Sequence, residues 1–200
     1  MPLLTVSARP GAGKTATTEL LIEWFDAKRV PSLTTRPLGT RDLNPFPEYI
    51  EVTVEDLDLM EENDELAWRV KVHDYEYATT WGDLEVACAS NELWIMVIAH
   101  NVVKNVHALS FEDRILSVYL LAESDDFLRA NMLNRGDDPV EIERRLLSSA
   151  NWDEEYMKCL VPYVTLRSMR MASVRAMARM MTKILMRKFP KLTYKGPTAP

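Results

Sequence analysis

Residues 7–15 read Ser-Ala-Arg-Pro-Gly-Ala-Gly-Lys-Thr, a short stretch that combines two glycines with a lysine and a hydroxyl group. An apolar run, Leu3–Val6, precedes this stretch, and a helical pattern over Thr15–Asp26 follows it. The backbone N–H groups of such a turn and the positive end of the helix favour an anion. The pattern is typical of a phosphate-binding loop, in which Lys14 reaches the outer phosphates of a nucleotide and Thr15 is a Mg²⁺ ligand.

The loop departs from the usual G-x-x-x-x-G-K-[ST] pattern at one place, because Ala8 stands where the first glycine is expected. Alanine is tolerable there if the position does not need a positive φ. The alternative interpretation is a glycine-rich turn with a surface lysine. The residues predicted to bind the nucleotide are Pro10, Gly11, Ala12, Gly13, Lys14, Thr15 and Ala16.

Strand-like and helical patterns alternate along the chain, and this predicts how the loop is positioned. The apolar or alternating runs are Leu3–Val6, Tyr49–Val54, Trp68–Val72, Leu93–Ala99, Ile115–Ala122 and Tyr163–Leu166. The helical patterns are Thr15–Asp26, Glu55–Asn63, Thr80–Asn91, Val102–Ala108, Asp125–Asn134, Pro139–Tyr156 and Met169–Phe189. Such alternation predicts an α/β fold with a parallel sheet covered by helices on both faces.

Two segments interrupt this alternation. Between Thr34 and Tyr77, a proline-rich loop (Pro37–Pro47) and two alternating strands around an acidic helix predict a small inserted lobe with antiparallel strands. In residues 125–156, two helices meet at residues 135–139, where Gly136 ends one helix and a proline starts the next.

The composition is that of a globular protein, with 47% hydrophobic and 27% charged residues in a chain of 200, and it predicts a single domain. The net charge of −6 argues against a nucleic-acid partner. No long apolar stretch predicts a membrane span, and Cys88 and Cys159 have no metal-binding spacing, so we expect a cytoplasmic protein. The basic, methionine-rich segment 169–189 is interpreted as a helix packed on the sheet, with a partner-binding helix as the alternative.

The order of these parts resembles the guanylate kinase family over about Leu3 to Leu166. The resemblance is carried by the phosphate loop and by the segments Ser32–Pro37, Tyr49, Val72–His73, Tyr77, Arg135–Gly136 and Arg144–Leu146. It implies a P-loop kinase fold with an inserted mixed β/α nucleotide-binding lobe and a helical lid. The implied boundaries are a core of residues 1–31, 82–124 and 157–190, an acceptor lobe of residues 32–81, a lid of residues 125–156 and a tail of residues 191–200.

The resemblance assigns roles to residues in the lobe. Arg36, Tyr49 and Tyr77 would hold the phosphate of the acceptor, which suits arginine because it grips phosphate with two parallel hydrogen bonds. The family's second phosphate-binding arginine has no exact counterpart, since its place holds Gly39, and Arg41 is the candidate substitute. Ser32 and Thr79 match the hydroxyl positions of the acceptor site.

The resemblance also assigns a catalytic role to two arginines of the lid. Arg135 and Arg145 would act with Lys14, because phosphoryl transfer depends on positioning and on stabilisation of charge. The alternative is that both arginines are surface charges of helices, paired with neighbouring acids.

The sequence departs from the family where the guanine base is read. Trp68 stands where the family has a glutamate, and Val97–Ala99 replaces an Asp-x-Asp element, with His100 and Asn101 following it. Loss of hydrogen-bonding acids weakens discrimination between bases. Trp68 is therefore expected to contact or stack on the acceptor.

The resemblance implies an ATP-dependent phosphotransferase that uses Mg²⁺ and transfers the γ-phosphoryl group to a nucleoside monophosphate, (d)GMP or a related nucleotide with altered base specificity. Two alternatives are a kinase of another phosphorylated acceptor, such as a sugar phosphate, and a non-catalytic binding module of the same fold. The sequence carries no signal of oligomeric state.

Overall fold

The central element is a five-stranded, entirely parallel sheet in the order β2-β7-β1-β8-β9. The computed structural model describes residues 2–39, 47–109, 112–168 and 173–197. The strands of this sheet are β1 (Leu3–Ala8), β2 (Lys28–Arg29), β7 (Trp94–Val97), β8 (Ile115–Ala122) and β9 (Tyr163–Ser168). Strands β7 and β1 are buried throughout, which explains why they read as continuous apolar runs.

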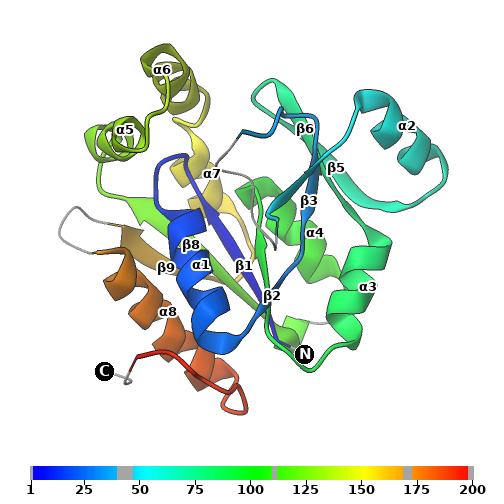
Figure 1. The fold of residues 1–200 in the computed structure, drawn as a ribbon, viewed down its shortest axis with the longest axis vertical. Helices are drawn as coiled ribbons and strands as arrows, with labels where there is room; N and C mark the ends of the chain where they lie inside the picture. Colours follow the sequence, from blue (N-terminus) through cyan, green and yellow to red (C-terminus); the bar gives the residue numbers. More distant parts are fainter. Residues whose placement is uncertain (1, 40–46, 110–111, 169–172, 198–200) are drawn as a thin grey trace.

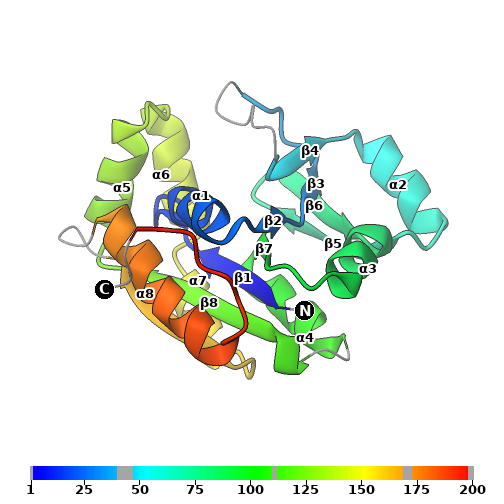
Figure 2. The ribbon, with the colours of Figure 1, turned by 60° about the horizontal axis from the view of Figure 1, so that its bottom comes forward.

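Helices cover both faces of this sheet, as Figures 1 and 2 show. Helices α1 (Lys14–Phe25) and α8 (Val174–Lys188) pack on one face, where Leu21 and Met181 join the core around Leu4. Helices α3 (Trp81–Ala89) and α4 (Val103–Ala108) pack on the other face, against the side chains of Leu3 and Met96. The predicted α/β architecture is therefore confirmed.

The inserted lobe holds a second sheet in the order β4-β3-β6-β5. Its strands are β3 (Ser32–Thr34), β4 (Tyr49–Glu51), β5 (Leu66–Val72) and β6 (Tyr75–Thr80), with helix α2 (Val54–Glu62) between β4 and β5. The expected antiparallel pairing is present between β3 and β6 and between β6 and β5, but β3 pairs with β4 in parallel, so the sheet is mixed. Strands this short lack the repeated alternation from which a strand is predicted.

Three helices follow β8 in the segment that was expected to form a lid, and we refer to them as the lid: α5 (Asp125–Asn134), α6 (Pro139–Ser148) and α7 (Trp152–Lys158). The predicted turn between α5 and α6 is present, with Gly136 at φ 83° and the Asp138 side chain capping α6. The single helix predicted over residues 139–156 is wrong. The helix ends at Ser148, since the following Ser-Ala-Asn contains two residues that favour turns and caps. Helix α7 then turns back, and Tyr156 stacks on Tyr119 of β8.

Helix α8 begins at Val174, and residues 169–172, where a helix was also predicted, lie outside the described part. Its apolar face, with Met177, Met181 and Leu185, is buried in the core shared with α1. Two 3₁₀ turns, His100–Val102 and Glu112–Arg114, complete the elements. Among the described residues, no helix is long and apolar enough to cross a lipid bilayer.

Candidate active site

The loop between β1 and α1 has the backbone that a phosphate cradle needs. Gly11 and Gly13 have φ values of 82° and 87°, and Gly13 is the N-cap residue directly before α1. A Cβ atom on Gly11 would lie 2.7 Å from the carbonyl oxygen of Leu128, so the position also lacks space for a side chain. Ala8, by contrast, lies inside β1 and is buried without a positive φ, which explains why alanine replaces the usual glycine there.

The Lys14 ammonium group turns back onto this loop. Its Nζ atom donates hydrogen bonds to the carbonyl oxygens of Ala8 (2.9 Å) and Arg9 (3.2 Å). Burial lowers its pKa to about 8, although the charge of Glu48 opposes this shift and that of Arg135 adds to it. A lysine held in this way has exchangeable partners, because phosphate oxygens can replace the two carbonyl oxygens. Thr15 follows it at the exposed rim of the site.

The lid is anchored directly to the phosphate loop. The Asn131 side chain of α5 donates to the carbonyl oxygen of Gly11 at 2.9 Å. Arg9 is buried, and its guanidinium group binds Asp125 at 2.7 Å and reaches the Ser149 hydroxyl at 3.4 Å. The sequence analysis assigned no role to Arg9 or Asn131, because their partners lie more than 100 residues away along the chain.

A single cavity of about 690 Å³ lies between the phosphate loop, the lobe and the lid. Many of the predicted site residues line it: Pro10, Gly11, Gly13, Lys14, Thr15, Ala16, Ser32, Arg36, Tyr49, Trp68, Tyr77, Arg135 and Arg145. Two predicted residues do not. Ala12 and Thr79 are buried, with 2% and 1% of their surfaces exposed. Arg41 lies outside the described residues.

The lobe side of the cavity brings Arg36, Tyr49 and Tyr77 together. The guanidinium group of Arg36 lies 5.1 Å from the centre of the Tyr49 ring, and the two tyrosine rings meet edge to face at 5.8 Å. Burial and then the adjacent charge of Glu48 raise the pKa of Tyr49 well above its usual value. The Tyr49 hydroxyl therefore keeps its proton and can donate a hydrogen bond to an anion.

The lid side contributes three arginines that are paired with acids of the lid. Arg135 donates to Asp137 at 2.8 Å, and Arg144 and Arg145 both bind Glu141, at 2.7 Å and 2.6 Å. These partners, Arg144 first, lower the pKa of Glu141 to about 2. The arginines thus have the nearby acidic partners expected of surface charges, within α6 for Arg144 and Arg145 and in the α5–α6 turn for Arg135, and they also line the cavity.

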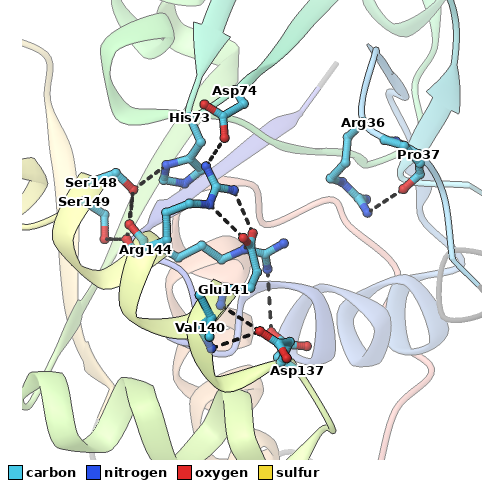
Figure 3. Close-up of polar contacts among 12 residues, drawn as sticks. Arg36, Pro37, His73, Asp74, Asp137, Val140, Glu141, Arg144, Ser148 and Ser149 are labelled. Atoms are coloured by element: carbon cyan, nitrogen blue, oxygen red, sulfur yellow. Dashed lines mark hydrogen bonds and ion pairs between the residues drawn. The ribbon is translucent and has the colours of Figure 1, made fainter.

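Lid and lobe touch at the tip of the β5–β6 hairpin, as Figure 3 shows. Arg144 binds Asp74, and the Ser148 hydroxyl lies 2.6 Å from Nδ1 of His73. The His73 ring stacks on Trp152 of α7, with centres 5.8 Å apart. Burial, followed by the charges of Arg144 and Arg145, lowers the pKa of His73. The cavity is therefore closed on this side by contacts that no sequence pattern predicted.

Comparison with known proteins gives matches in sequence and in structure, although no protein-family model matches the chain. A guanylate kinase of Hyphomonas neptunium is 28% identical over 146 residues, which are 72% of this chain and 66% of that protein. A guanylate kinase from Anaplasma phagocytophilum superposes with a TM-score of 0.69 at 17% identity, covering 99% of this chain and 88% of its own. The chain is thus similar in sequence to one protein named guanylate kinase and in fold to another.

The fold is shared more widely among kinases. A gluconokinase from Sinorhizobium meliloti 1021 superposes with a TM-score of 0.51 at 15% identity, over 93% of this chain and 92% of that one. The chain thus shares its fold with these two kinases. The matched segment spans slightly less than two thirds of the curated guanylate kinase.

One wall of the cavity is formed by apolar side chains. Trp68, Val97 and Ala99 line it, and these are the residues that were expected, from the sequence, to stand in place of carboxylates. Trp68 is only 8% exposed, and it packs in the core cluster with Met96 and Val102. The neighbouring His100 is buried, where it binds Glu155 at 2.7 Å. The wall is thus apolar, and His100 does not replace the lost acids.

The described residues include no group of three or more histidine, cysteine, aspartate or glutamate side chains arranged for a metal ion. A Mg²⁺ ion at this site would be held by the Thr15 hydroxyl together with phosphate oxygens and water. That coordination fits the ion, which usually keeps several waters and relies on substrate phosphates.

Proposed function

We propose that this chain is a nucleoside monophosphate kinase that transfers the γ-phosphoryl group of ATP to (d)GMP or a related nucleotide. One observation carries the proposal: the phosphate loop and the cluster of Arg36, Tyr49 and Tyr77 line the same cavity. The first suits a donor triphosphate, and the second suits the phosphate of an acceptor. The similarity to proteins named guanylate kinase supports the same reaction.

The residues divide the work of transfer between them. Arg36 and the two tyrosines would fix the acceptor phosphate, while Lys14 would neutralise charge on the donor. Arg135 and Arg145 would break their ion pairs with Asp137 and Glu141. Both arginines would then contact the phosphoryl group being transferred, where positive charge stabilises the transition state. Closure of the lid would also exclude water and so limit hydrolysis of ATP. Mg²⁺, bound through Thr15 and the phosphates, would supply further neutralisation.

The base preference is proposed to be relaxed relative to guanylate kinases. A carboxylate that binds the edge of guanine rejects other bases, because they leave its buried oxygen atoms unpaired. The apolar wall formed by Trp68, Val97 and Ala99 offers contact or stacking instead. We expect GMP to exceed other monophosphates by less than about a hundredfold in kcat/KM, the range that apolar contacts allow.

Two other functions fit part of the site. A kinase of another phosphorylated acceptor, such as a sugar phosphate, would use the same phosphate grip and the apolar wall. A non-catalytic binding module would not need Lys14 and Thr15 in a complete phosphate loop. Neither alternative involves nucleic acid or a membrane. The free thiols of Cys88 and Cys159 are compatible with the cytoplasm as the place of action.

A coupled assay with ATP, Mg²⁺ and a panel of acceptors tests the proposal. The panel contains ribo- and deoxynucleoside monophosphates and sugar phosphates. Turnover should require a nucleoside monophosphate and disappear in Lys14→Ala, whereas Lys28→Ala, a surface lysine paired with Glu92, should behave like the wild type. Turnover with a sugar phosphate alone would favour the second function. Absence of ATP–Mg²⁺ binding at millimolar concentration would exclude catalysis.

A further inference from the structure

A buried ion pair lines the cavity beside the acceptor cluster. Nη1 of Arg29 lies 3.1 Å from Oε2 of Glu48, and the two side chains are only 4% and 10% exposed. Arg29 is the last residue of β2 in the core sheet, and Glu48 directly precedes β4 in the lobe. Sequence analysis assigned neither residue a role, since they lie 19 positions apart in no recognised motif.

The neighbours of Glu48 place it between the donor and acceptor sides. Its backbone carbonyl accepts a hydrogen bond from the N–H of Ser32 at 3.0 Å, and Tyr49 follows it in sequence. The negative charge of Glu48 opposes the lowering of the Lys14 pKa by burial, and it adds to the raising of the Tyr49 pKa by burial. A carboxylate that acts on both groups faces the region through which the phosphoryl group would pass.

The other two acidic residues that line the cavity differ from Glu48 in their partners or in their exposure. Glu141 is held by Arg144 and Arg145 within the lid, and Glu19 is exposed on α1. Among the described cavity residues, Glu48 is thus the buried acid on the acceptor side. A carboxylate at this place would repel a phosphate held by Arg36 and Tyr49, and the charge of Arg29 would offset part of that repulsion.

We propose that the Arg29–Glu48 pair is a specificity-determining element of the acceptor site, which limits the negative charge that an acceptor can carry. The pair admits a nucleotide with one phosphate group and disfavours one with two. A second phosphate would extend from the Arg36–Tyr49 cluster toward Lys14, into the region where the charge of Glu48 acts. This inference rests on the proposed function, because it assumes that the Arg36–Tyr49 cluster holds the acceptor.

The test compares Glu48→Gln, Arg29→Met and the double variant by calorimetric titration. The ligands are a nucleoside monophosphate and the matching diphosphate, with the donor site saturated by ADP, and Mg²⁺ is left out to prevent reverse transfer. Glu48→Gln should tighten the diphosphate about tenfold relative to the monophosphate, the size expected for one unit charge a few ångströms away. Arg29→Met removes the positive charge that offsets Glu48 and should weaken both ligands at least about tenfold, and the double variant should reverse most of this loss.

Two controls separate charge from folding. Glu19→Gln removes an exposed acid from the rim of the same cavity and should leave both affinities unchanged. Should Arg29→Met not fold, as judged by its thermal transition, Glu48→Gln and the double variant still decide the question. An unchanged ratio of diphosphate to monophosphate affinity in Glu48→Gln would overturn the proposal.

A second titration tests the same charge effect without requiring enzymatic turnover. Inorganic pyrophosphate, titrated into the protein without nucleotide, should bind more tightly to Glu48→Gln than to the wild type, and Glu19→Gln should bind it like the wild type. Equal pyrophosphate affinity in Glu48→Gln and wild type would also overturn the proposal. If the coupled assay finds no turnover while this charge effect persists, the proposed function fails and the electrostatic role of the pair stands.

Discussion

The hydroxyl of Ser148 in the lid lies 2.6 Å from Nδ1 of His73 at the tip of the lobe hairpin. His73 has φ 58°, and its ring stacks on Trp152. Arg144 binds the adjacent Asp74. Lid and lobe, which are far apart in sequence, are thus joined through two neighbouring residues of one turn. Figure 3 shows this contact on one side and Arg36 apart from it, on the lobe.

This contact predicts a pH dependence of stability. Burial lowers the pKa of His73, so the folded protein favours neutral histidine, while the unfolded chain titrates near 6.5. The stabilisation is therefore present above about pH 6.5 and is lost as the pH falls through the lower folded pKa. In urea unfolding, the wild type should lose more stability between pH 7.5 and pH 5 than His73→Gln. Equal losses in the two proteins would contradict the role of His73.

Arginines on the two faces of the lid are expected to differ in their effect on kcat. Arg135→Ala and Arg145→Ala should each lower kcat about 10²–10³-fold, the usual loss when a charge-stabilising donor is removed. Arg129→Ala is the matched control, because this arginine binds Asp126 and Glu143 on the outside of the lid. Its turnover should stay close to that of the wild type. A comparable loss in all three variants would indicate a general effect on the lid.

The phosphate loop predicts unequal effects of two glycine substitutions. Both Gly11 and Gly136 have a positive φ, but a Cβ meets the Leu128 backbone only at Gly11. Gly136→Ala should cost about 1–2 kcal/mol of unfolding free energy from the backbone conformation alone. Gly11→Ala should cost more and should also weaken ATP binding, which equilibrium titration measures. Equal ATP affinity in Gly11→Ala and Gly136→Ala would show that the phosphate loop accommodates a Cβ atom at residue 11 without losing its ability to bind ATP.

Trp68 predicts separate effects on stability and on acceptor choice. Trp68→Ala should lower the free energy of unfolding by about 3–5 kcal/mol, because the side chain fills the second core cluster. Trp81→Ala is the control, since Trp81 is 41% exposed and should cost much less. Trp68→Phe should keep most of the stability while changing the ratios of kcat/KM among nucleoside monophosphates. Unchanged ratios would mean that Trp68 is only a core residue.

The sequence by itself determined the elements that depend on residues close together in the chain. The phosphate loop needs two glycines and a lysine between a strand and a helix, and these lie within residues 3–26. The central strands β7 and β8 appear as apolar runs because both of their faces are covered. The turn at Gly136 and Pro139 follows from backbone preferences of single residues. These elements were predicted correctly.

Only the tertiary structure decided which distant residues meet. Strands β2, β3 and β4 have two or three residues each, too few for a periodic pattern, and their pairing depends on the rest of the lobe. The position of α7 against the core sheet, with Tyr156 stacked on Tyr119, joins residues 37 positions apart in the chain. Arg29 and Glu48 become a pair, and Arg9 reaches Asp125, only when the lobe and the lid are folded onto the core. Local sequence encodes conformation, whereas charge pairing across the cavity requires the complete fold.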